Sequence, residues 1–241
     1  MKIIKGNYGE CRFCDNMDEE FGLPSLEEKS WDLCLTDPPY NVNAKGNSQK
    51  THKNEKWKTP TKIDYDDNIE DFKEFNMNWI NNCLRISKGL IFTPGNVNLQ
   101  FWFQQTNPRD ILFHRKPNGA GITSMCFQNR CEIILCYGIF NRKFLRNIYS
   151  IYLRNGFLRE DTFLHPHPKS LELYRAIIKD AIPQSVIDPF LGSGTTAEVC
   201  ESLGIPWLGF ELMEDYAPDI EKRIQRGIIK KKYATKQQTL F

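Results

Sequence analysis

Short strand-like runs alternate with helix-like stretches along this chain, and the alternation restricts the fold more than any other feature. The strand-like runs occur at 2–5, 31–37, 89–93, 110–115, 131–137, 185–188 and 206–210. Between them, apolar residues recur at spacings of three and four, the pattern of one helix face, as in 69–86 and 169–181. Strands alternating with helices predict an α/β domain with a mostly parallel sheet that helices cover on both faces.

The second of these runs leads into a stiff turn, Asp37-Pro38-Pro39-Tyr40. Two prolines remove two backbone donors and fix φ. The turn can therefore present a carboxylate, a proline carbonyl and an aromatic ring at one edge of the sheet. The two acceptors would hold a planar amine while Tyr40 stacks on its ring. Asp-Pro and Pro-Pro are also ordinary turn dipeptides, so these residues alone leave a plain strand-ending turn open.

A glycine-containing turn follows a strand in the last quarter of the chain and opens a helix. Gly192 and Gly194 allow a ligand to approach the backbone closely, and the amides at the helix start are unpaired. The turn lacks the Lys-Ser/Thr ending of a P-loop, which argues against a triphosphate site, whereas Glu211 can accept both hydroxyls of a ribose. Because ligands of open α/β sheets bind beyond the strands' carboxyl ends, Asp37, Asp188 and Glu211 are predicted to line one crevice.

The composition of the chain indicates its class of protein and the cellular location expected for it. It has 241 residues, 40% of them hydrophobic and 26% charged, which is ordinary for one globular α/β domain. No apolar run approaches the ~20 residues of a membrane span and the N-terminus lacks a signal-peptide core, so we expect a cytoplasmic location without a membrane partner. In that location the eight cysteines are expected to be reduced thiols. Cys11 and Cys14 form a CxxC, but a zinc site would need two more ligands and the sequence has no second CxxC, so no metal is predicted.

Basic residues gather in two stretches. The long loop expected at 41–67 carries six lysines, and segment 141–159 mixes five basic residues with aromatic ones and contains no acid. Such mixtures suit a nucleic-acid surface, although a solvated linker in the first case and a solvated face over a small core in the second remain open. The predicted nucleic-acid contacts are Lys53, Lys56, Lys58, Arg142, Lys143, Arg146 and Arg154.

Two motifs taken together resemble those of a known family. Thr-Asp-Pro-Pro-Tyr at 36–40 and Asp-Pro-Phe-Leu-Gly-Ser-Gly-Thr-Thr at 188–196 are similar to motifs of the amino-group DNA methyltransferases that use S-adenosylmethionine. Their order, with the cofactor loop last, resembles the circularly permuted β group, and the likeness covers most of the chain. It implies a single domain over 1–241, with the basic loop 41–67 and a small target-recognition insertion at 138–164. The sheet it implies is Rossmann-like, doubly wound, mostly parallel and seven-stranded, with one antiparallel strand.

The resemblance also implies roles for individual residues. His165-Pro-His-Pro-Lys169 looks like the segment before the cofactor loop, Arg130-Cys-Glu132 looks like a late strand, and Asn7 would end an edge strand that touches the cofactor adenine. The implied catalytic residues are Asp37, Pro38, Pro39 and Tyr40. The implied cofactor-binding residues are Asn7, Asp37, Lys169, Asp188, Pro189, Phe190, Gly192, Ser193, Gly194, Thr195, Thr196, Glu211 and Leu212.

The activity implied is site-specific methylation of the N6 amino group of an adenine flipped out of DNA, with S-adenosylmethionine as cofactor and DNA as partner. Asp rather than Ser before Pro-Pro-Tyr favours adenine over cytosine. N4-cytosine or RNA-adenine methylation stays open, as does a non-catalytic nucleic-acid-binding partner subunit of the same fold. A prokaryotic or viral modification enzyme, acting as a homodimer or with a separate specificity partner, fits the same resemblance.

Overall fold

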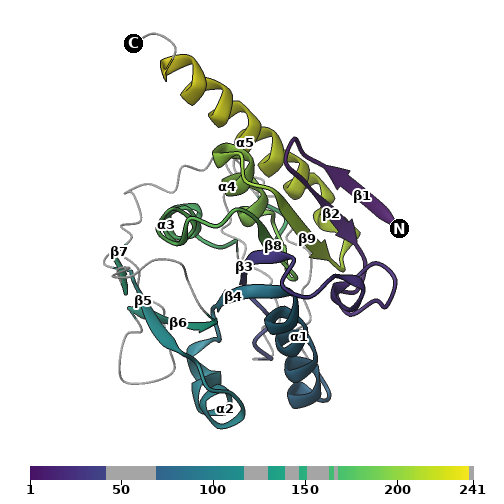
Figure 1. The fold of residues 1–241 in the computed structure, drawn as a ribbon, viewed down its shortest axis with the longest axis vertical. Helices are drawn as coiled ribbons and strands as arrows, with labels where there is room; N and C mark the ends of the chain where they lie inside the picture. Colours follow the sequence, from purple (N-terminus) through teal and green to yellow (C-terminus); the bar gives the residue numbers. More distant parts are fainter. Residues whose placement is uncertain (42–68, 117–129, 139–146, 151–162, 166–167, 239–241) are drawn as a thin grey trace, which may run out of the picture.

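A mixed β-sheet runs through the part of the chain that the computed structural model describes, residues 1–41, 69–116, 130–138, 147–150, 163–165 and 168–238 (Figure 1). Nine strands of these residues pair in the order β1-β2-β9-β8-β3-β4-β6-β5-β7. They are β1 Lys2–Lys5, β2 Gly9–Phe13, β3 Trp31–Thr36, β4 Ser87–Phe92, β5 Asp110–Arg115, β6 Cys131–Gly138, β7 Ile148–Ser150, β8 Val186–Asp188 and β9 Trp207–Glu211. The α/β class predicted from the sequence is confirmed.

The predicted number of strands, seven with one antiparallel, is wrong for the described residues. The parallel set is β2, β9, β8, β3 and β4, while β6 runs antiparallel to both its neighbours and β1 runs antiparallel to β2. The additional strands are β2 and β7. In β2, the buried residues Cys11 and Phe13 alternate with the charged residues Glu10 and Arg12. This is the two-residue alternation of a strand, but it was missed in the sequence because the residues that alternate with the buried ones are charged. With three residues, β7 is too short to show a pattern.

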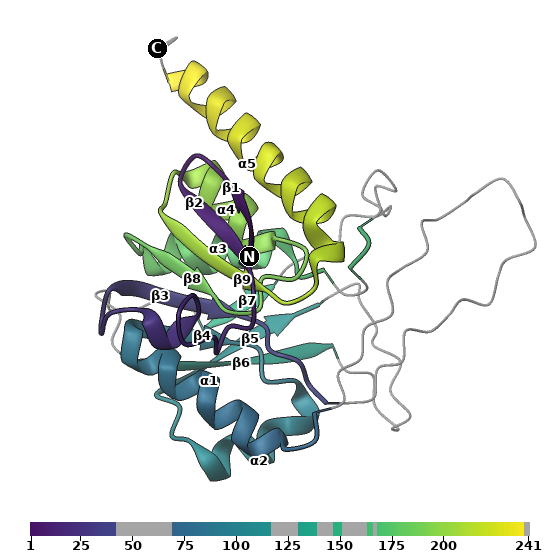
Figure 2. The ribbon, with the colours of Figure 1, turned by 90° about the vertical axis from the view of Figure 1, so that its right-hand side faces the viewer.

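Helices cover both faces of the sheet (Figures 1 and 2). One face packs against α1 Phe72–Ile86 and α2 Leu99–Gln105, and the other packs against α3 Leu171–Ala181, α4 Thr195–Leu203 and α5 Ala217–Gln238. Successive residues of a strand point to opposite faces of the sheet, so they pack alternately into the hydrophobic core on one face and the core on the other. No helix among the described residues is both long enough and apolar enough to cross a membrane.

The aromatic stripe of α1 forms the core beneath one face of the sheet. Asp71 caps this helix by accepting a hydrogen bond from the backbone amide of Glu74 at 2.9 Å. Trp79 is fully buried, and its ring meets the rings of Phe92 and Trp102 edge-on, with centroids 5.2 and 5.8 Å away. These contacts are of the kind that aromatic pairs prefer, so α1 holds β4 and α2 in place.

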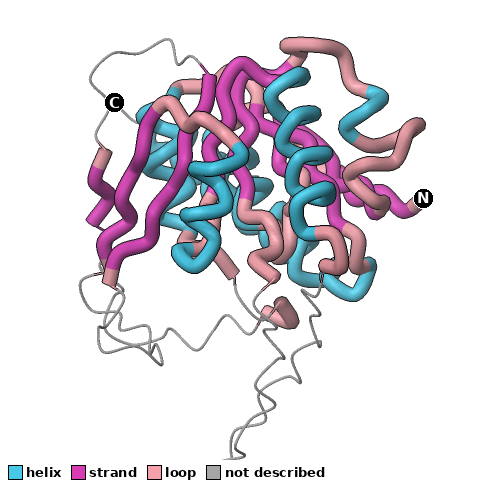
Figure 3. Tube along the Cα trace, turned by 90° about the horizontal axis from the view of Figure 1, so that it is seen from below, coloured by secondary structure: helices cyan, strands magenta, loops and turns pink. Residues whose placement is uncertain are grey.

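Parallel pairing brings the carboxyl ends of five neighbouring strands, β2, β9, β8, β3 and β4, to one edge of the sheet, whose strands run side by side in Figure 3. Thr36 of β3 lies opposite Phe92 of β4, and Phe13 of β2 lies opposite Glu211 of β9. Asp188, the last residue of β8, lies between them, opposite Gly209 of β9. The residues that follow these strands therefore meet in one place.

Candidate active site

Two neighbouring cavities lie at this edge of the sheet. The larger has a volume of about 280 Å³ and extends from Cys14, Asp15 and Asn16 to Asp37. The smaller, of about 40 Å³, lies beside Lys169 and Ser193. Both are lined by Asp37, His165, Phe190 and Gly192. Asp37 and Glu211 therefore line the same cavity, as predicted, whereas Asp188 lines the smaller cavity beside it.

The glycine turn is held from beneath by Asp188. This buried carboxylate accepts hydrogen bonds from the hydroxyls of Thr36 and Thr196, each at 2.6 Å, and from the Phe190 amide at 3.1 Å. Burial raises the pKa of Asp188 to about 6, although these hydrogen bonds lower it. Gly192 has a φ of +53°, and a Cβ there would lie 3.0 Å from His165 Nε2. Asp188 and Thr196 thus shape the turn, while the turn itself borders the cavities.

Glu211 lines the larger cavity directly beside the glycine turn. One carboxylate oxygen accepts from the Gly192 amide and the other from the Met213 amide, each at 2.8 Å. Burial raises the pKa of Glu211 to about 7 against the lowering effect of these backbone hydrogen bonds. Each carboxylate oxygen can accept more than one hydrogen bond, so Glu211 keeps acceptor capacity toward the cavity.

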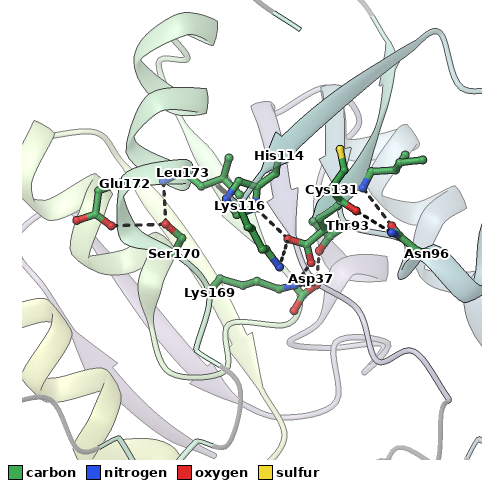
Figure 4. Close-up of polar contacts among 12 residues, drawn as sticks. Asp37, Thr93, Asn96, His114, Lys116, Cys131, Lys169, Ser170, Glu172 and Leu173 are labelled. Carbon is green, nitrogen blue, oxygen red and sulfur yellow. Dashed lines mark hydrogen bonds and ion pairs between the residues drawn. The ribbon is translucent and has the colours of Figure 1, made fainter. Parts of the chain in front are cut away.

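Asp37 is fixed by donors from three parts of the chain. Its Oδ1 atom accepts hydrogen bonds from the hydroxyls of Tyr40 and Thr93 and lies 2.9 Å from Lys169 Nζ. Figure 4 shows Thr93 and Lys169 beside Asp37. Tyr40 is fixed in turn, because Asn98 Nδ2 donates to its carbonyl oxygen at 2.8 Å. The stiff turn and these contacts hold the carboxylate where it lines both cavities.

Lys169 lies between two carboxylates. Its ammonium donates to the Tyr40 hydroxyl at 2.8 Å and lies 3.2 Å from Glu132 Oε1. Burial alone would lower the pKa of Lys169, but the negative charges of Asp37 and Glu132 raise it well above its ordinary value. The lysine therefore stays charged beside Asp37.

Most of the predicted site residues meet in this space. The larger cavity is lined by Asp37, Pro39, Pro189, Phe190, Gly192, Glu211 and Leu212, and the smaller one by Asp37, Lys169, Asp188, Phe190, Gly192, Ser193 and Thr195. Pro38 is buried beside the turn. Gly194 precedes α4 with a φ of +84°, and a Cβ there would lie 3.2 Å from Ile220 Cα, so its role is close packing of the turn against α5.

The predicted place of Asn7 is wrong. Residues 9–13 form a second strand that returns antiparallel to β1, so Asn7 lies in the hairpin turn before the amino end of β2. Residues Cys14 to Asn16, which follow the carboxyl end of β2, line the cavity instead. The error follows directly from the missed strand, because a single edge strand would have carried residue 7 to the site.

Sequence reasoning also missed several residues that complete the site. Asn16 and Tyr216 line the larger cavity and are buried, and neither Asn16 Oδ1 nor the Tyr216 hydroxyl has a hydrogen-bond partner in the described part of the chain. Thr93 holds Asp37, and Glu132 holds Lys169. Thr93 follows β4 as Asp37 follows β3, so its place at a strand end was a usable signal.

The predicted nucleic-acid contacts lie outside the described residues. They are Lys53, Lys56, Lys58, Arg142, Lys143, Arg146 and Arg154. One aromatic residue of the basic segment 141–159 is described, Tyr149 in β7. It is 3% exposed and donates a hydrogen bond to Asp180 Oδ2 at 3.1 Å, so it belongs to the core and offers no stacking surface.

Comparisons with known proteins agree with this geometry. Residues 140–222 match the model of a DNA methylase family, the N6/N4 methyltransferases. The type II methyltransferase M.HinfI of Haemophilus influenzae is 27% identical over 242 residues, which cover 84% of this chain and 65% of that protein. In sequence, the chain is therefore similar to the N6/N4 amino-group DNA methyltransferases. In its length it spans about two thirds of M.HinfI.

Solved structures of DNA methyltransferases share the fold of this chain. The crystal structure of the M1.HpyAVI–SAM complex has a TM-score of 0.60 at 20% identity and covers 90% of this chain and 98% of that one. The PvuII DNA methyltransferase, described as cytosine-N4-specific, has a TM-score of 0.62 at 16% identity and covers 91% and 87%. At these identities the likeness shows the fold alone.

Proposed function

We propose that this chain transfers a methyl group from S-adenosylmethionine to the N6 amino group of an adenine in DNA. The observation that carries the proposal is a single cavity that is lined by both Glu211 and Asp37. A nucleoside hydroxyl acceptor and an amine acceptor thus face the same space. The family, and the cofactor named in the M1.HpyAVI complex, support this choice.

The larger cavity offers what an adenosine group requires. Its volume of about 280 Å³ is near the lower end of ligand pockets, which begin at roughly 300 Å³. Buried polar atoms without partners are costly, and Asn16 Oδ1 and the Tyr216 hydroxyl are two such atoms on its lining. Glu211 would accept ribose hydroxyls, and Asn16 an adenine amino group. The cofactor's amino-acid end would then lie toward Gly192, Ser193 and Thr195.

The residues at Asp37 suit an amine nucleophile that loses its proton late. S-adenosylmethionine supplies, when bound, a methyl group on a sulfonium that is open to attack. The exocyclic amine of adenine is weakly nucleophilic because its lone pair is delocalised. Hydrogen bonds from that amine to the Asp37 carboxylate and the Pro38 carbonyl would localise the lone pair and aim it. A carboxylate is too weak a base to deprotonate the neutral amine first, so Asp37 receives the proton after transfer.

The target base must leave the duplex to reach Asp37, and we expect the Tyr40 ring to stack on it. Rate then comes from positioning and oriented acceptors, without a covalent intermediate. N4-cytosine remains a second candidate because the PvuII enzyme, which shares the fold, is described as cytosine-N4-specific. Asp at position 37 favours adenine. The chain order, with Asp37 before the glycine turn, fits the circularly permuted β group.

DNA contacts and sequence specificity would fall to the basic loop 41–67 and the insertion at 138–164, or to a separate partner. The type II methyltransferases that resemble this chain favour a role in DNA modification beside a restriction nuclease. The chain would act inside a prokaryotic cell, or one infected by a virus that encodes it.

The proposal is tested by transfer of labelled methyl groups to unmethylated DNA. Replacing Asp37 with Ala should abolish transfer while cofactor binding, measured by calorimetry, stays near that of the wild type. The matched control is Asp32→Ala at the other end of β3, because Asp32 also pairs with a lysine, Lys88, at 2.6 Å. We expect the control to transfer methyl groups at the wild-type rate. Methyl transfer at the wild-type rate by the Asp37→Ala variant would contradict the proposed mechanism.

A further inference from the structure

Glu132 is a carboxylate that the proposed mechanism does not use, and yet it is tied to Asp37 through one side chain. It lies on β6, and its Oε1 atom is 3.2 Å from Lys169 Nζ. The same Nζ atom is 2.9 Å from Asp37 Oδ1. The three side chains are 16%, 18% and 22% exposed, so the chain of charges is mostly shielded from water.

Glu132 is itself firmly held. Its Oε2 atom is 3.0 Å from Nδ1 of His114, on the neighbouring strand β5, and 3.2 Å from Nζ of Lys116, which directly follows that strand; His114 and Lys116 are labelled in Figure 4. Asn96 clamps the backbone on either side of it, donating to the Cys131 carbonyl at 2.8 Å and accepting from the Ile133 amide at 3.1 Å. Because Glu132 is held by this many contacts and lies one side chain away from Asp37, we expect it to influence the position of Asp37.

We propose that Glu132 is a positioning residue for methyl transfer, which acts by holding the Lys169 ammonium against Asp37 Oδ1. The inference rests on the proposed function. An ammonium has three donors, and Lys169 directs them at Asp37, Tyr40 and Glu132. With Oδ1 engaged by Lys169, Tyr40 and Thr93, the rotation of the carboxylate is fixed and Oδ2 is left to accept from the target amine.

The charge of Glu132 matters as much as its geometry. During transfer the bond from nitrogen to the methyl carbon forms while the carbon–sulfur bond breaks and its electron pair returns to sulfur. The nitrogen carries the positive charge until a proton leaves to Asp37. An uncompensated Lys169 cation close by would oppose that charge. Glu132 neutralises it, in a shielded site where such interactions are stronger than in water.

The test compares single and double variants of the full chain in the same methyl-transfer assay. Lys169→Met should lower kcat on the order of 10²-fold, the usual cost of misplacing a reacting group by about 1 Å. Glu132→Gln, which keeps the shape, should lower kcat about tenfold by the same reasoning, with KM for the cofactor unchanged. The control is Glu10→Gln, whose carboxylate pairs with Arg12 at 2.9 Å on β2, and it should keep the wild-type kcat.

The double variant separates positioning from simple structural support. If Glu132 acts through Lys169, adding Glu132→Gln to Lys169→Met should cost no further kcat. An equal loss in both backgrounds, or wild-type kcat in Glu132→Gln, would overturn the inference. Should Glu132→Gln fail to fold, Glu132→Asp keeps the charge but falls short of Lys169 Nζ, and wild-type kcat there would overturn it as well. A wild-type protein that transfers nothing would instead defeat the proposed function.

Discussion

Protonation of Glu211 should set the pH dependence of cofactor binding. Its carboxyl is buried in the cavity wall, which raises its pKa to about 7. Ribose hydroxyls donate hydrogen bonds, so they prefer the ionised carboxylate. At pH 8 about nine-tenths of the free protein would carry the ionised form, and at pH 6 about one-tenth would. Binding therefore weakens as the pH falls through 7, and Kd at pH 6 should be roughly tenfold higher than at pH 8.

Isothermal titration calorimetry with S-adenosylmethionine measures this directly. Repeating the titration at pH 7 in buffers of different ionisation enthalpy should reveal proton release on binding, because the ligand favours the ionised form. Glu211→Gln should bind weakly at each pH and lose most of the dependence. Asp188, whose pKa is raised to about 6, would account for what remains below pH 7. A Kd that is flat from pH 6 to pH 8, or tighter at pH 6, would refute the reasoning.

Two further changes test the framework of the site. Gly95→Ala places a Cβ 2.9 Å from Tyr40 Cγ, at a residue whose φ is +69°. We expect this variant to lose about 1–3 kcal/mol of stability and to have a lower kcat. A wild-type kcat would show that the position of Tyr40 need not be fixed. The Glu198 side chain is 1% exposed, and it pairs with Arg223 at 2.7 Å between α4 and α5. Glu198→Ala should lower the free energy of unfolding, measured in urea, by about 3–5 kcal/mol, because the buried Arg223 loses the carboxylate that pairs with it. A loss below 1 kcal/mol would contradict that account.

The sequence predicted the parts of the fold that depend on strong local patterns. The apolar run before Asp37 and the stripe around Trp79 have clear periods, and both form the expected elements. Strand β2 was missed because Glu10 and Arg12 face outward between buried Cys11 and Phe13. That single omission also misplaced Asn7, since the edge hairpin reverses the direction of the chain there.

At the site, residues at strand ends could be predicted and residues reached across the sheet could not. Asp37 and Glu211 follow buried strands, so the rule for parallel sheets locates them. Glu132 lies near the start of an antiparallel strand, and only the pairing of β4 with β6 brings it to Lys169. Such contacts depend on sheet order, which a local pattern in the sequence does not encode.

The most direct test of the central claim is to identify the nucleoside that receives the methyl group. Purified protein is incubated with labelled S-adenosylmethionine and unmethylated, enzymatically amplified genomic DNA, and the DNA is then digested to nucleosides and separated. We predict label on the N6-methylated adenine nucleoside. Label on N4-methylcytosine would keep the chemistry at Asp37 and contradict the assignment of adenine. Cofactor binding without label in the DNA would contradict the claim that the chain is a DNA methyltransferase.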